Sequence, residues 1–328
     1  MSDLPRVIVT VPPHADFLEE VAAHPVVGGL RLNTVMPLAD SPRETLARLA
    51  ALGQPLWVDL KGRQLRVAEA AVPPFTAVRL SHAIQVDTPT VARFGDGSEE
   101  VRVLEVAGDR LILEDGPRRV LGPGESVNIP DPSLRVLGFL TRTDQAYLAA
   151  MRELDLRKVM LSFVEESSDL DAVRRELPDV ELVAKIESRR GLRFVPQAVN
   201  LNARLMAARG DLYLELERPH HLLRALRRIV ATDPEAIVAS RLLNSLAWDL
   251  EPSAQDLTDV AYLLTLGYRH LMLGDEVCLR RESVISALNL MECLFREVQP
   301  QARPKAWVGG VTAGGGKPRP YEASVHAR

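Results

Sequence analysis

Two apolar segments of the sequence end in charged residues that could act together in chemistry. The segment LVAKIE carries Lys185 and Glu187, and the segment LMAARGD carries Asp211. Short apolar runs that alternate with helical segments are typical of buried parallel strands. Because α/β folds build their sites where such strands end, we expect Lys185, Glu187 and Asp211 to form one cluster.

The residue types of this cluster suit a particular chemistry. Two carboxylates bind a hard divalent cation, and a lysine beside them supplies positive charge or an acidic proton. A simpler interpretation is that Lys185 and Glu187 form a structural ion pair at the rim of the sheet, since such pairs are common. The pattern of these two segments alone leaves both interpretations open.

The elements that would position these residues follow a regular order. Eight short apolar runs, each followed by a helical segment, read as strands. They lie at 6–11, 26–32, 56–60 and 158–162, in the runs that end at Lys185 and Asp211, and at 236–239 and 268–273. Eight βα units predict an α/β protein with a (β/α)₈ TIM barrel, whose catalytic residues are expected on the loops after the strands.

The segment 67–131 interrupts this α/β order. It has no convincing helix, and its short β-type runs are separated by Asp-Gly, Gly-Asp and Pro-Gly turns. We therefore expect a barrel formed by 1–66 and 132–299, with an inserted all-β lid domain at 67–131 after the third strand, hereafter the insert. The Gly/Pro-rich tail at 300–328 is expected to be disordered.

The composition is that of an ordinary globular protein, with 46% hydrophobic and 26% charged residues. A net charge of -4 gives no general attraction to nucleic acid or to acidic membranes. No apolar run has the length of a membrane span, and the first residues lack a signal-peptide layout. Cys278 and Cys293 have neither metal-site nor redox spacing, so we expect two core thiols and a cytoplasmic protein.

Charged and polar residues recur at the ends of the predicted strands. They are Arg31, Asn33, Asp59, Lys61, Arg66, Lys185, Glu187, Arg209, Asp211, Ser240 and Glu276. Such a rim suits a small phosphorylated or carboxylated anion that is held with a divalent metal. Exposed charges at strand ends are often inert, but their presence on many strands at once favours a functional site.

The chain resembles the pyruvate kinase family over residues 5–295. The resemblance is carried, in order, by RVIVTVPP, GLRLN, WVDLKGRQLR, FGDGSEEVRVLEV, ESVNIP, LTRTD, VMLSFVEESSDL, AKIESRRG, ARGDLYLEL, ASRLLNSL and DLTDVAYLLTLGYRHLMLGDE. The insert falls where this family carries a mobile lid domain. No segment resembles the family's C-terminal regulatory domain, so we expect a protein without that domain.

The resemblance implies roles for the residues of the acid site. Glu187 and Asp211 match the ligands of Mg²⁺ (or Mn²⁺), which also grips phosphoenolpyruvate or pyruvate. Lys185 matches the lysine that stabilises charge on the transferred phosphoryl group. Gly210 and Asp211 match the backbone that binds the substrate carboxylate, and Ser240 replaces a threonine implicated in substrate binding and proton transfer.

The resemblance also implies a second region for phosphates and an alkali cation. Arg31 and Arg66 match arginines that face the phosphates and belong to the catalytic set. Asn33 matches an asparagine in the nucleotide and monovalent-cation region, and Asp59 matches an alkali-cation ligand, so K⁺ is an open expectation. Phosphoryl transfer depends mainly on positioning and positive charge, which these residues would supply.

Departures from the family pattern gather in the nucleotide and alkali-cation positions. Val35 and Met36 stand where the family has serine and histidine, and Gln64 replaces a glutamate or lysine. Glu125 and Ser126 stand near a lysine position of the lid, where a glutamate would repel a polyphosphate. Further departures lie at Leu60, Glu165, Tyr213, Arg241 and Asn244. The groups for the metal and the three-carbon acid are kept.

We therefore expect a pyruvate kinase-like phosphotransferase that binds Mg²⁺ and phosphoenolpyruvate or pyruvate, with ADP or another acceptor. One alternative is a Mg²⁺-dependent lyase or decarboxylase that acts on a 2-oxo acid through an enolate. A second alternative is a non-catalytic homologue that serves as a metabolite sensor or partner subunit. The expected partners are a small 2-oxo acid, a nucleotide by resemblance, and further copies of the chain, with no nucleic acid and no membrane.

Overall fold

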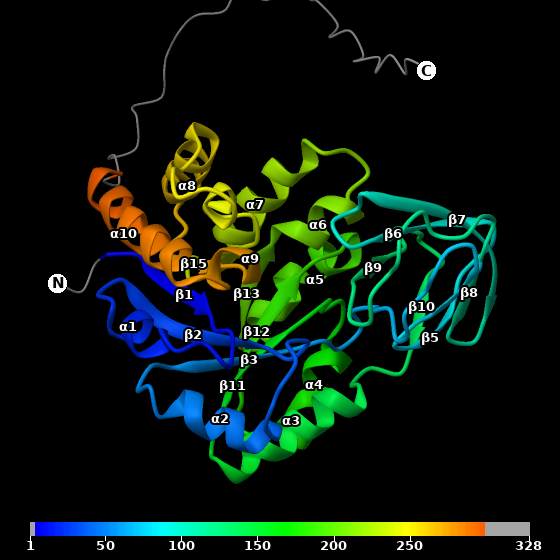
Figure 1. Ribbon diagram of the computed structural model, residues 1–328, viewed down its shortest axis with the longest axis horizontal. Coiled ribbons are helices and arrows are strands. Elements are labelled where there is room, and N and C mark those ends of the chain that lie inside the picture. Colours follow the sequence, from blue (N-terminus) through cyan, green and yellow to red (C-terminus); the bar gives the residue numbers. More distant parts are fainter. Residues whose placement is uncertain (1–3, 299–328) are drawn as a thin grey trace, which may run out of the picture.

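Eight parallel strands close into a barrel in a computed structural model of the chain, which describes residues 4–298 (Figure 1). The strands are β1 (Arg6–Thr10), β2 (Val27–Asn33), β3 (Leu56–Leu60), β11 (Lys158–Leu161), β12 (Glu181–Ile186), β13 (Ala203–Ala208), β14 (Ile237–Ala239) and β15 (His270–Leu273). Around the barrel they follow the chain order, and β15 pairs with β1 to close it. The predicted TIM barrel is confirmed.

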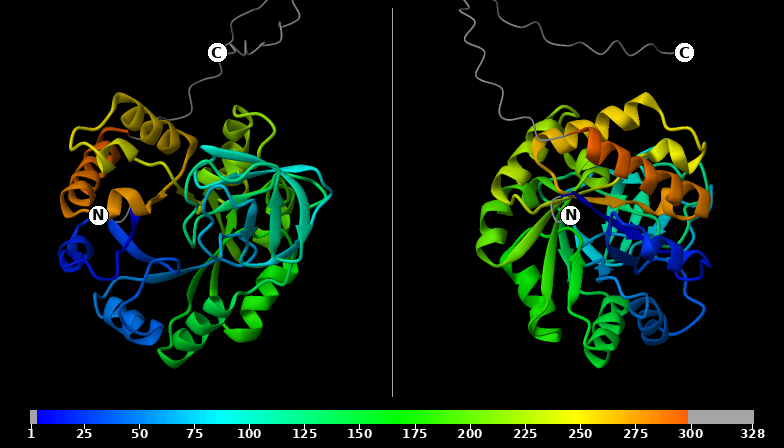
Figure 2. Two further views of the ribbon diagram at one scale, coloured as in Figure 1. Left: turned by 45° about the vertical axis from the view of Figure 1, so that its right-hand side comes forward. Right: turned by 90° about the vertical axis from the view of Figure 1, so that its left-hand side faces the viewer.

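Helices surround the barrel on its outer side (Figures 1 and 2). They are α1 (Leu18–Ala23), α2 (Pro42–Ala50), α3 (Arg142–Glu153), α4 (Ser167–Glu176), α5 (Arg189–Asn200), α7 (His221–Thr232), α8 (Ala254–Leu266) and α10 (Arg281–Glu297). Helix α2 begins with a capping box, in which Ser41 Oγ accepts from the Glu44 amide and the Glu44 side chain accepts from the Ser41 amide.

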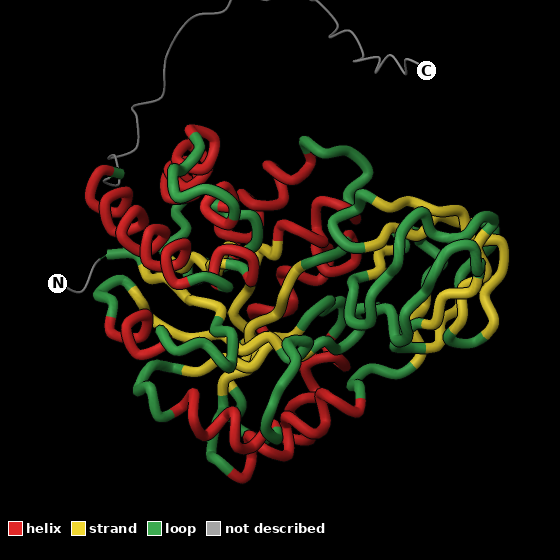
Figure 3. The backbone as a smooth tube through the Cα atoms, viewed as in Figure 1, coloured by secondary structure: helices red, strands yellow, loops and turns green. Residues whose placement is uncertain are grey.

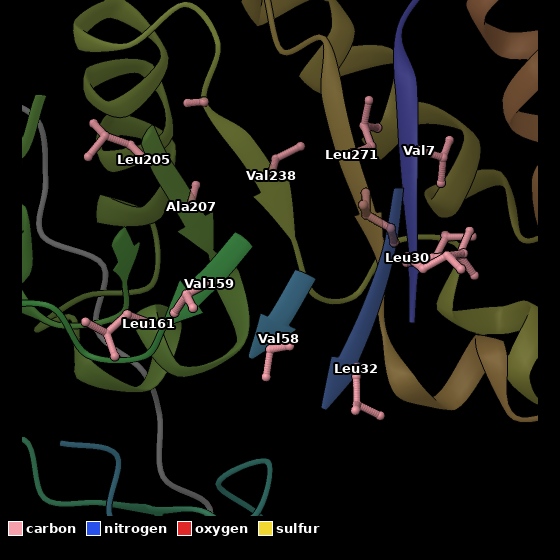
Figure 4. Close-up of a cluster of buried hydrophobic side chains, with 14 of the residues drawn as sticks. Val7, Leu30, Leu32, Val58, Val159, Leu161, Leu205, Ala207, Val238 and Leu271 are labelled. Carbon is pink, nitrogen blue, oxygen red and sulfur yellow. The ribbon is translucent and has the colours of Figure 1, made fainter. Parts of the chain in front are cut away.

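The barrel strands alternate between two environments, because successive side chains of a strand point to opposite faces. Outward-facing residues such as Val7, Leu30 and Val58 pack in the large core between strands and helices (Figure 4). The inward-facing residues form a separate apolar cluster of Ile8, Trp57, Met160, Val183, Met206, Ala208, Ile237, Ala239 and Met272. Further along the same inward faces lie Arg31, Asp59 and Lys185, so polar groups replace apolar ones towards the carboxyl ends of the strands.

The insert forms antiparallel sheets beside the barrel (Figure 3). One sheet has the order β4-β8-β7-β6-β9, and a second pairs β10 with β5. The strands within the insert are β4 (Ala77–Arg79), β5 (Ala83–Gln85), β6 (Thr90–Phe94), β7 (Glu99–Ala107), β8 (Arg110–Leu113) and β9 (Val127–Asn128). Strand β10 (Arg135–Leu137) lies just past the predicted end of the insert at 131. Phe94, Leu111 and Leu121 belong to a core of its own, separate from that of the barrel.

Three short helices follow barrel strands where the sequence predicted none, and they carry site residues. They are α6 (Arg209–Glu215), η1 (Asn244–Ala247) and α9 (Asp275–Cys278). Asp211 thus lies in the first turn of α6 instead of at a strand end, which corrects the prediction. The apolar run 205–208 does form the end of β13, but a short helix begins directly after it and buries Leu212 and Leu214.

Other expectations have mixed outcomes. Cys278 is buried as expected, but Cys293 is exposed on α10, so only one of the two thiols belongs to the core. The tail at 300–328 lies outside the described residues. Across residues 4–298, no helix combines the length and the apolar character that a membrane crossing needs.

Candidate active site

A cleft of about 840 Å³ opens at the carboxyl ends of the barrel strands, next to the insert. Seven residues to which the resemblance assigned a role line it, and Lys61 and Glu276 of the predicted rim line it too; the seven are Arg31, Asn33, Arg66, Lys185, Glu187, Asp211 and Ser240. The insert contributes Asp96, Gly97 and Ser98 to its wall. The structure therefore brings together these seven residues, which are separated by up to 209 positions in the chain, at the place where TIM barrels carry their sites.

Asp59 lies at the bottom of this site and is completely buried. Its Oδ1 accepts from Lys185 Nζ at 3.1 Å, and its Oδ2 accepts from Arg31 Nε at 2.9 Å and lies 3.5 Å from Lys61 Nζ. Burial alone would raise the pKa of Asp59, but Lys185, Lys61 and Arg31 outweigh it and hold the pKa well below its ordinary range. Asp59 is therefore an ionised carboxylate that joins three cationic side chains.

The two lysines beside Asp59 differ in their protonation. For Lys185, burial would lower the pKa, but Asp59 and Glu187 outweigh it and the pKa is raised. Burial lowers the pKa of Lys61 to about 7, although Asp59 opposes this shift. Lys185 Nζ also donates to Ser162 Oγ at 2.7 Å. Lys185 thus keeps its positive charge and a fixed position at neutral pH, as a charge stabiliser requires.

Glu187 and Asp211 are the two carboxylates of the cleft that were predicted to bind a metal. Glu187 Oε1 lies 3.3 Å from Lys185 Nζ, and its Oε2 accepts from the Phe163 amide at 2.8 Å. Burial raises the pKa of Glu187, Lys185 opposes this shift, and the charge of Asp211 adds to it. The two acidic groups therefore repel each other across the cleft, which a bound cation would relieve.

Asp211 is held by one residue of the barrel and one of the insert. Its Oδ2 accepts from Gln64 Nε2 at 3.0 Å, and its Oδ1 accepts from Asn128 Nδ2 at 2.9 Å. Gln64 in turn accepts from Arg66 Nη2 at 2.6 Å, and Arg66 Nη1 donates to the Gly124 carbonyl at 2.6 Å. A chain of hydrogen bonds thus connects the insert to the carboxylate of Asp211.

Ser240 lies on a loop after β14 whose backbone is unusual. Ser240, Arg241 and Leu243 have φ values of 71°, 56° and 51°, in the left-handed region that residues with a Cβ rarely adopt. Arg209 fixes this loop, because its Nη2 donates to the Ser240 carbonyl at 2.7 Å. A Cβ placed on Gly210 would lie 3.5 Å from Ser240 Oγ, so Gly210 lies directly beside the serine, as their predicted joint role requires.

The predicted phosphate and alkali-cation residues are occupied by protein contacts. Arg31 Nη1 donates to Asp275 Oδ1 at 2.8 Å, in addition to its bond with Asp59. Asn33 Nδ2 donates to Asp275 Oδ2 at 2.8 Å, and Asn33 Oδ1 accepts from the Val35 amide at 3.3 Å. Asp275 was missed in the sequence, because it follows the last strand after a glycine and nothing marked it as a partner of Arg31.

The residues present fit a divalent cation better than a monovalent one. Glu187 and Asp211 offer hard oxygen donors at one cleft, and the substrate and water would complete the set. In the part of the chain that the structure describes, no group of three or more His, Cys, Asp or Glu residues could hold a metal. Both oxygens of Asp59 are engaged by cationic side chains, which does not fit K⁺ at this carboxylate.

Comparisons with known proteins identify the family of the chain. A family model described as "Pyruvate kinase, barrel domain" matches residues 76–280, which is more than half of the chain. The chain belongs to the pyruvate kinase family. The sequence resemblance to that family is therefore confirmed.

Individual pyruvate kinases are distant relatives of the chain. The pyruvate kinase of Borreliella burgdorferi is 22% identical over 91% of this chain and 69% of its own length. That of Methanocaldococcus jannaschii is 24% identical, over 87% of this chain and 68% of its own. The crystal structure of Cryptosporidium parvum pyruvate kinase superposes with a TM-score of 0.76 at 18% identity, covering 90% of this chain and 70% of the other. At this identity the likeness in structure concerns the fold.

Proposed function

We propose that this pyruvate kinase family member is a phosphotransferase that acts on phosphoenolpyruvate or pyruvate with Mg²⁺ or Mn²⁺. The supporting observation is that Lys185, Glu187, Asp211 and Ser240 line one cleft at the carboxyl end of the barrel. In the reaction, the bond between phosphorus and the enol oxygen breaks and a bond to an acceptor oxygen forms. The enol that remains takes up a proton at carbon to give pyruvate.

The residues of the chain have separate tasks in this proposal. Glu187 and Asp211 would hold the metal, which supplies positive charge to the oxygens of the acid when it is bound. Lys185 remains protonated through Asp59 and Glu187, so its ammonium group stabilises charge on the phosphoryl group in transfer. Ser240 presents a hydroxyl beside Gly210, where it can bind the acid or pass on a proton.

Phosphorus NMR tests the proposed transfer. The purified protein is mixed with Mg²⁺ and phosphoenolpyruvate, with and without ADP. Production of ATP and pyruvate only in the presence of ADP would support the phosphotransferase. If no phosphoryl transfer is seen but Mn²⁺ broadens the phosphoenolpyruvate signal, the result supports the proposed binding site for the acid and contradicts transfer to ADP.

A lysine substitution tests the assignment of the charge stabiliser. Lys185→Met should abolish turnover, while Mn²⁺ binding stays within about threefold of wild type, because the carboxylates remain. Lys158→Met is a matched control, since Lys158 lies on β11 at the other end of the barrel and pairs with Glu181. Full activity of the Lys185→Met variant would refute the assignment.

A lyase is the second candidate, because the predicted nucleotide groups are occupied. Arg31 is bound by Asp59 and Asp275, and Asn33 Nδ2 donates to Asp275 Oδ2 at 2.8 Å. In decarboxylation of a 2-oxo diacid such as oxaloacetate, the carbon–carbon bond breaks, CO₂ leaves, and the electron pair passes to the carbonyl oxygen before carbon is protonated. Release of CO₂ from oxaloacetate without any nucleotide would support the lyase, and strict dependence on a nucleotide would contradict it.

A further inference from the structure

Arg241 and Tyr213 form a contacting pair in the lining of the active-site cleft. The guanidinium carbon of Arg241 lies 5.2 Å from the centre of the Tyr213 ring, which is the distance of a cation–π contact. Both residues line the cleft, and both also line a smaller outer pocket of about 250 Å³. The pair therefore forms a wall between the cleft and the outer surface.

The backbone holds Arg241 in this place at an energetic cost. Ser240 and Arg241 both have positive φ values, a conformation that residues with a Cβ keep only where their surroundings impose it. Arg209 fixes the loop from one side through the Ser240 carbonyl. Asp256 fixes the other side, since its carboxylate accepts from the Ser245 amide at 2.9 Å and from the Asn244 amide at 3.2 Å. These hydrogen bonds hold the loop in the conformation that places Arg241 in the lining of the cleft.

Arg241 also has charge that the protein does not neutralise. Among residues 4–298, it forms neither an ion pair nor a hydrogen bond, in contrast to Arg31, which is held by Asp59 and Asp275. The nearby acid of the insert is Asp96, whose pKa is lowered first by hydrogen bonds from Ser98 and only weakly by Arg241. The five donors of the guanidinium are therefore available to a ligand.

The insert packs against α6 close to the Arg241–Tyr213 pair. Arg93 Nη1 donates to the Leu214 carbonyl of α6 at 2.7 Å, and a Cβ on Gly97 would lie 2.6 Å from Leu214 Cδ2. The turn with Asp96, Gly97 and Ser98 is thus packed on α6, next to Tyr213. A ligand that extends from the acid site in this direction would lie between the insert and the Arg241–Tyr213 pair.

The cleft is also larger than a three-carbon acid needs. Its volume of about 840 Å³ lies in the range of pockets that enclose much larger ligands. Besides Lys185, Glu187 and Asp211, its lining includes Arg241 and Tyr213, which the proposed acid site does not use. We propose that Arg241, supported by Tyr213, binds a second anionic group of the ligand, a carboxylate or a phosphate.

This proposal rests on the proposed acid site and extends it to a substrate class. The preferred ligands are 2-oxo acids or enol phosphates with a distal anionic group, since arginine binds both carboxylate and phosphate oxygens in a bidentate manner. A three-carbon acid alone would leave Arg241 without a partner. The distal group, not the acid end, would then determine which substrate is bound best.

The experiment compares two ligands that differ only in the distal group. Binding of 2-oxoglutarate and of 2-oxopentanoate, which has a methyl group in place of the distal carboxylate, is measured by calorimetry on the full chain with Mg²⁺. We expect 2-oxoglutarate to bind at least about tenfold more tightly, the effect of one charge-assisted contact. In Arg241→Gln the ratio should fall towards one, and in Tyr213→Leu it should fall in part. A third ligand, 2-oxo-4-phosphonobutanoate, shows whether a phosphonate is preferred to a carboxylate.

Each outcome decides a different question. Arg224→Gln is the matched control, because Arg224 is an exposed arginine of α7 outside the cleft, and it should keep the wild-type ratio. Equal binding of the two ligands by wild type, or a ratio that survives in Arg241→Gln, would overturn the role of Arg241 and leave the acid site intact. Failure of every 2-oxo acid to bind would overturn the acid site and, with it, this extension.

Discussion

Asn128 Nδ2 donates to Asp211 Oδ1 across 2.9 Å and joins the insert to the carboxylate of the candidate metal site. Asn128 is almost completely buried, and its own Oδ1 has no hydrogen-bond partner among the described residues. A buried polar atom without a partner costs about 1–3 kcal/mol. The chain tolerates this cost at the point where the insert meets Asp211, which favours a role for Asn128 in orienting that carboxylate.

Substitution of Asn128 should loosen the insert at this contact. We expect Asn128→Ala to weaken the local attachment by about 1–2 kcal/mol, so that amides of β9 exchange roughly five to thirty times faster. Hydrogen–deuterium exchange with mass spectrometry measures this change. Asn200→Ala, at the exposed end of α5, is the control and should leave exchange in β9 as in wild type. Unchanged exchange in Asn128→Ala would show that the bond does not hold the insert.

Asp59 should be important for stability, because it compensates three buried cations. Asp59→Asn removes the charge that faces Arg31, Lys61 and Lys185 and leaves these groups without their shared partner. Loss of one member of a buried ionic network typically destabilises a protein by about 3–5 kcal/mol. Urea unfolding measures the loss as a lower midpoint at an unchanged slope. Asp155→Asn, which removes an exposed pair with Arg157, should cost less than about 1 kcal/mol.

A midpoint for Asp59→Asn within experimental error of wild type would contradict this account of the network. The pKa of Lys61 provides a second, independent test of the same network. Its pKa of about 7 depends on burial, and the nearby carboxylate opposes the shift. Without that carboxylate the pKa of Lys61 should fall further, which titration of the isotopically labelled lysine by NMR can follow.

The barrel could be predicted because each strand repeats one simple pattern. Apolar residues face the helices on one side and the barrel interior on the other, which gives the continuous apolar runs that mark buried parallel strands. The convergence of Lys185 and Glu187 followed from their place at the end of such a run. Chain order and spacing thus determined both the fold and the centre of the site.

Other parts of the site depend on tertiary contacts that no local pattern encodes. Asp211 was predicted at a strand end because it closely follows the apolar run 205–208, and nothing in that run shows that a short helix begins at Arg209. The bond of Asn128 to Asp211 spans 83 positions, and that of Asp275 to Arg31 spans 244. Arg241 was noted only as a departure from a motif, and its stacking on Tyr213 emerges from the left-handed loop that carries it.

Removal of one of the two proposed metal-binding carboxylates should weaken metal binding without unfolding the protein. In Glu187→Gln the side chain keeps its shape but loses the charge that attracts the cation, so Mn²⁺ should bind at least about tenfold more weakly. Electron paramagnetic resonance of free Mn²⁺ measures this affinity. Glu251→Gln, an exposed substitution outside the cleft, should bind Mn²⁺ as wild type does. Equal affinities of wild type and Glu187→Gln would remove Glu187 from the metal site.

Glu215 should make the stability of the metal-free protein depend on pH. Burial raises the pKa of Glu215 to about 8, and the charges of Asp211 and Glu165 add to the shift. The unfolded chain has an ordinary glutamate with a pKa near 4.3, so between about pH 4.3 and 8 the folded state binds one proton more than the unfolded state. The free energy of unfolding therefore falls as the pH rises through this range, by up to several kcal/mol from this group.

Glu215→Gln should remove this slope, because glutamine does not titrate and resembles the protonated acid. Urea unfolding from pH 5 to 8 in the presence of a chelator would then show a smaller loss of stability in Glu215→Gln than in wild type. Glu176→Gln, an exposed substitution on α4, should keep the wild-type slope. If wild type and Glu215→Gln lose stability in parallel, Glu215 is ionised in the folded protein at neutral pH, and the acidic groups near the insert are compensated in another way.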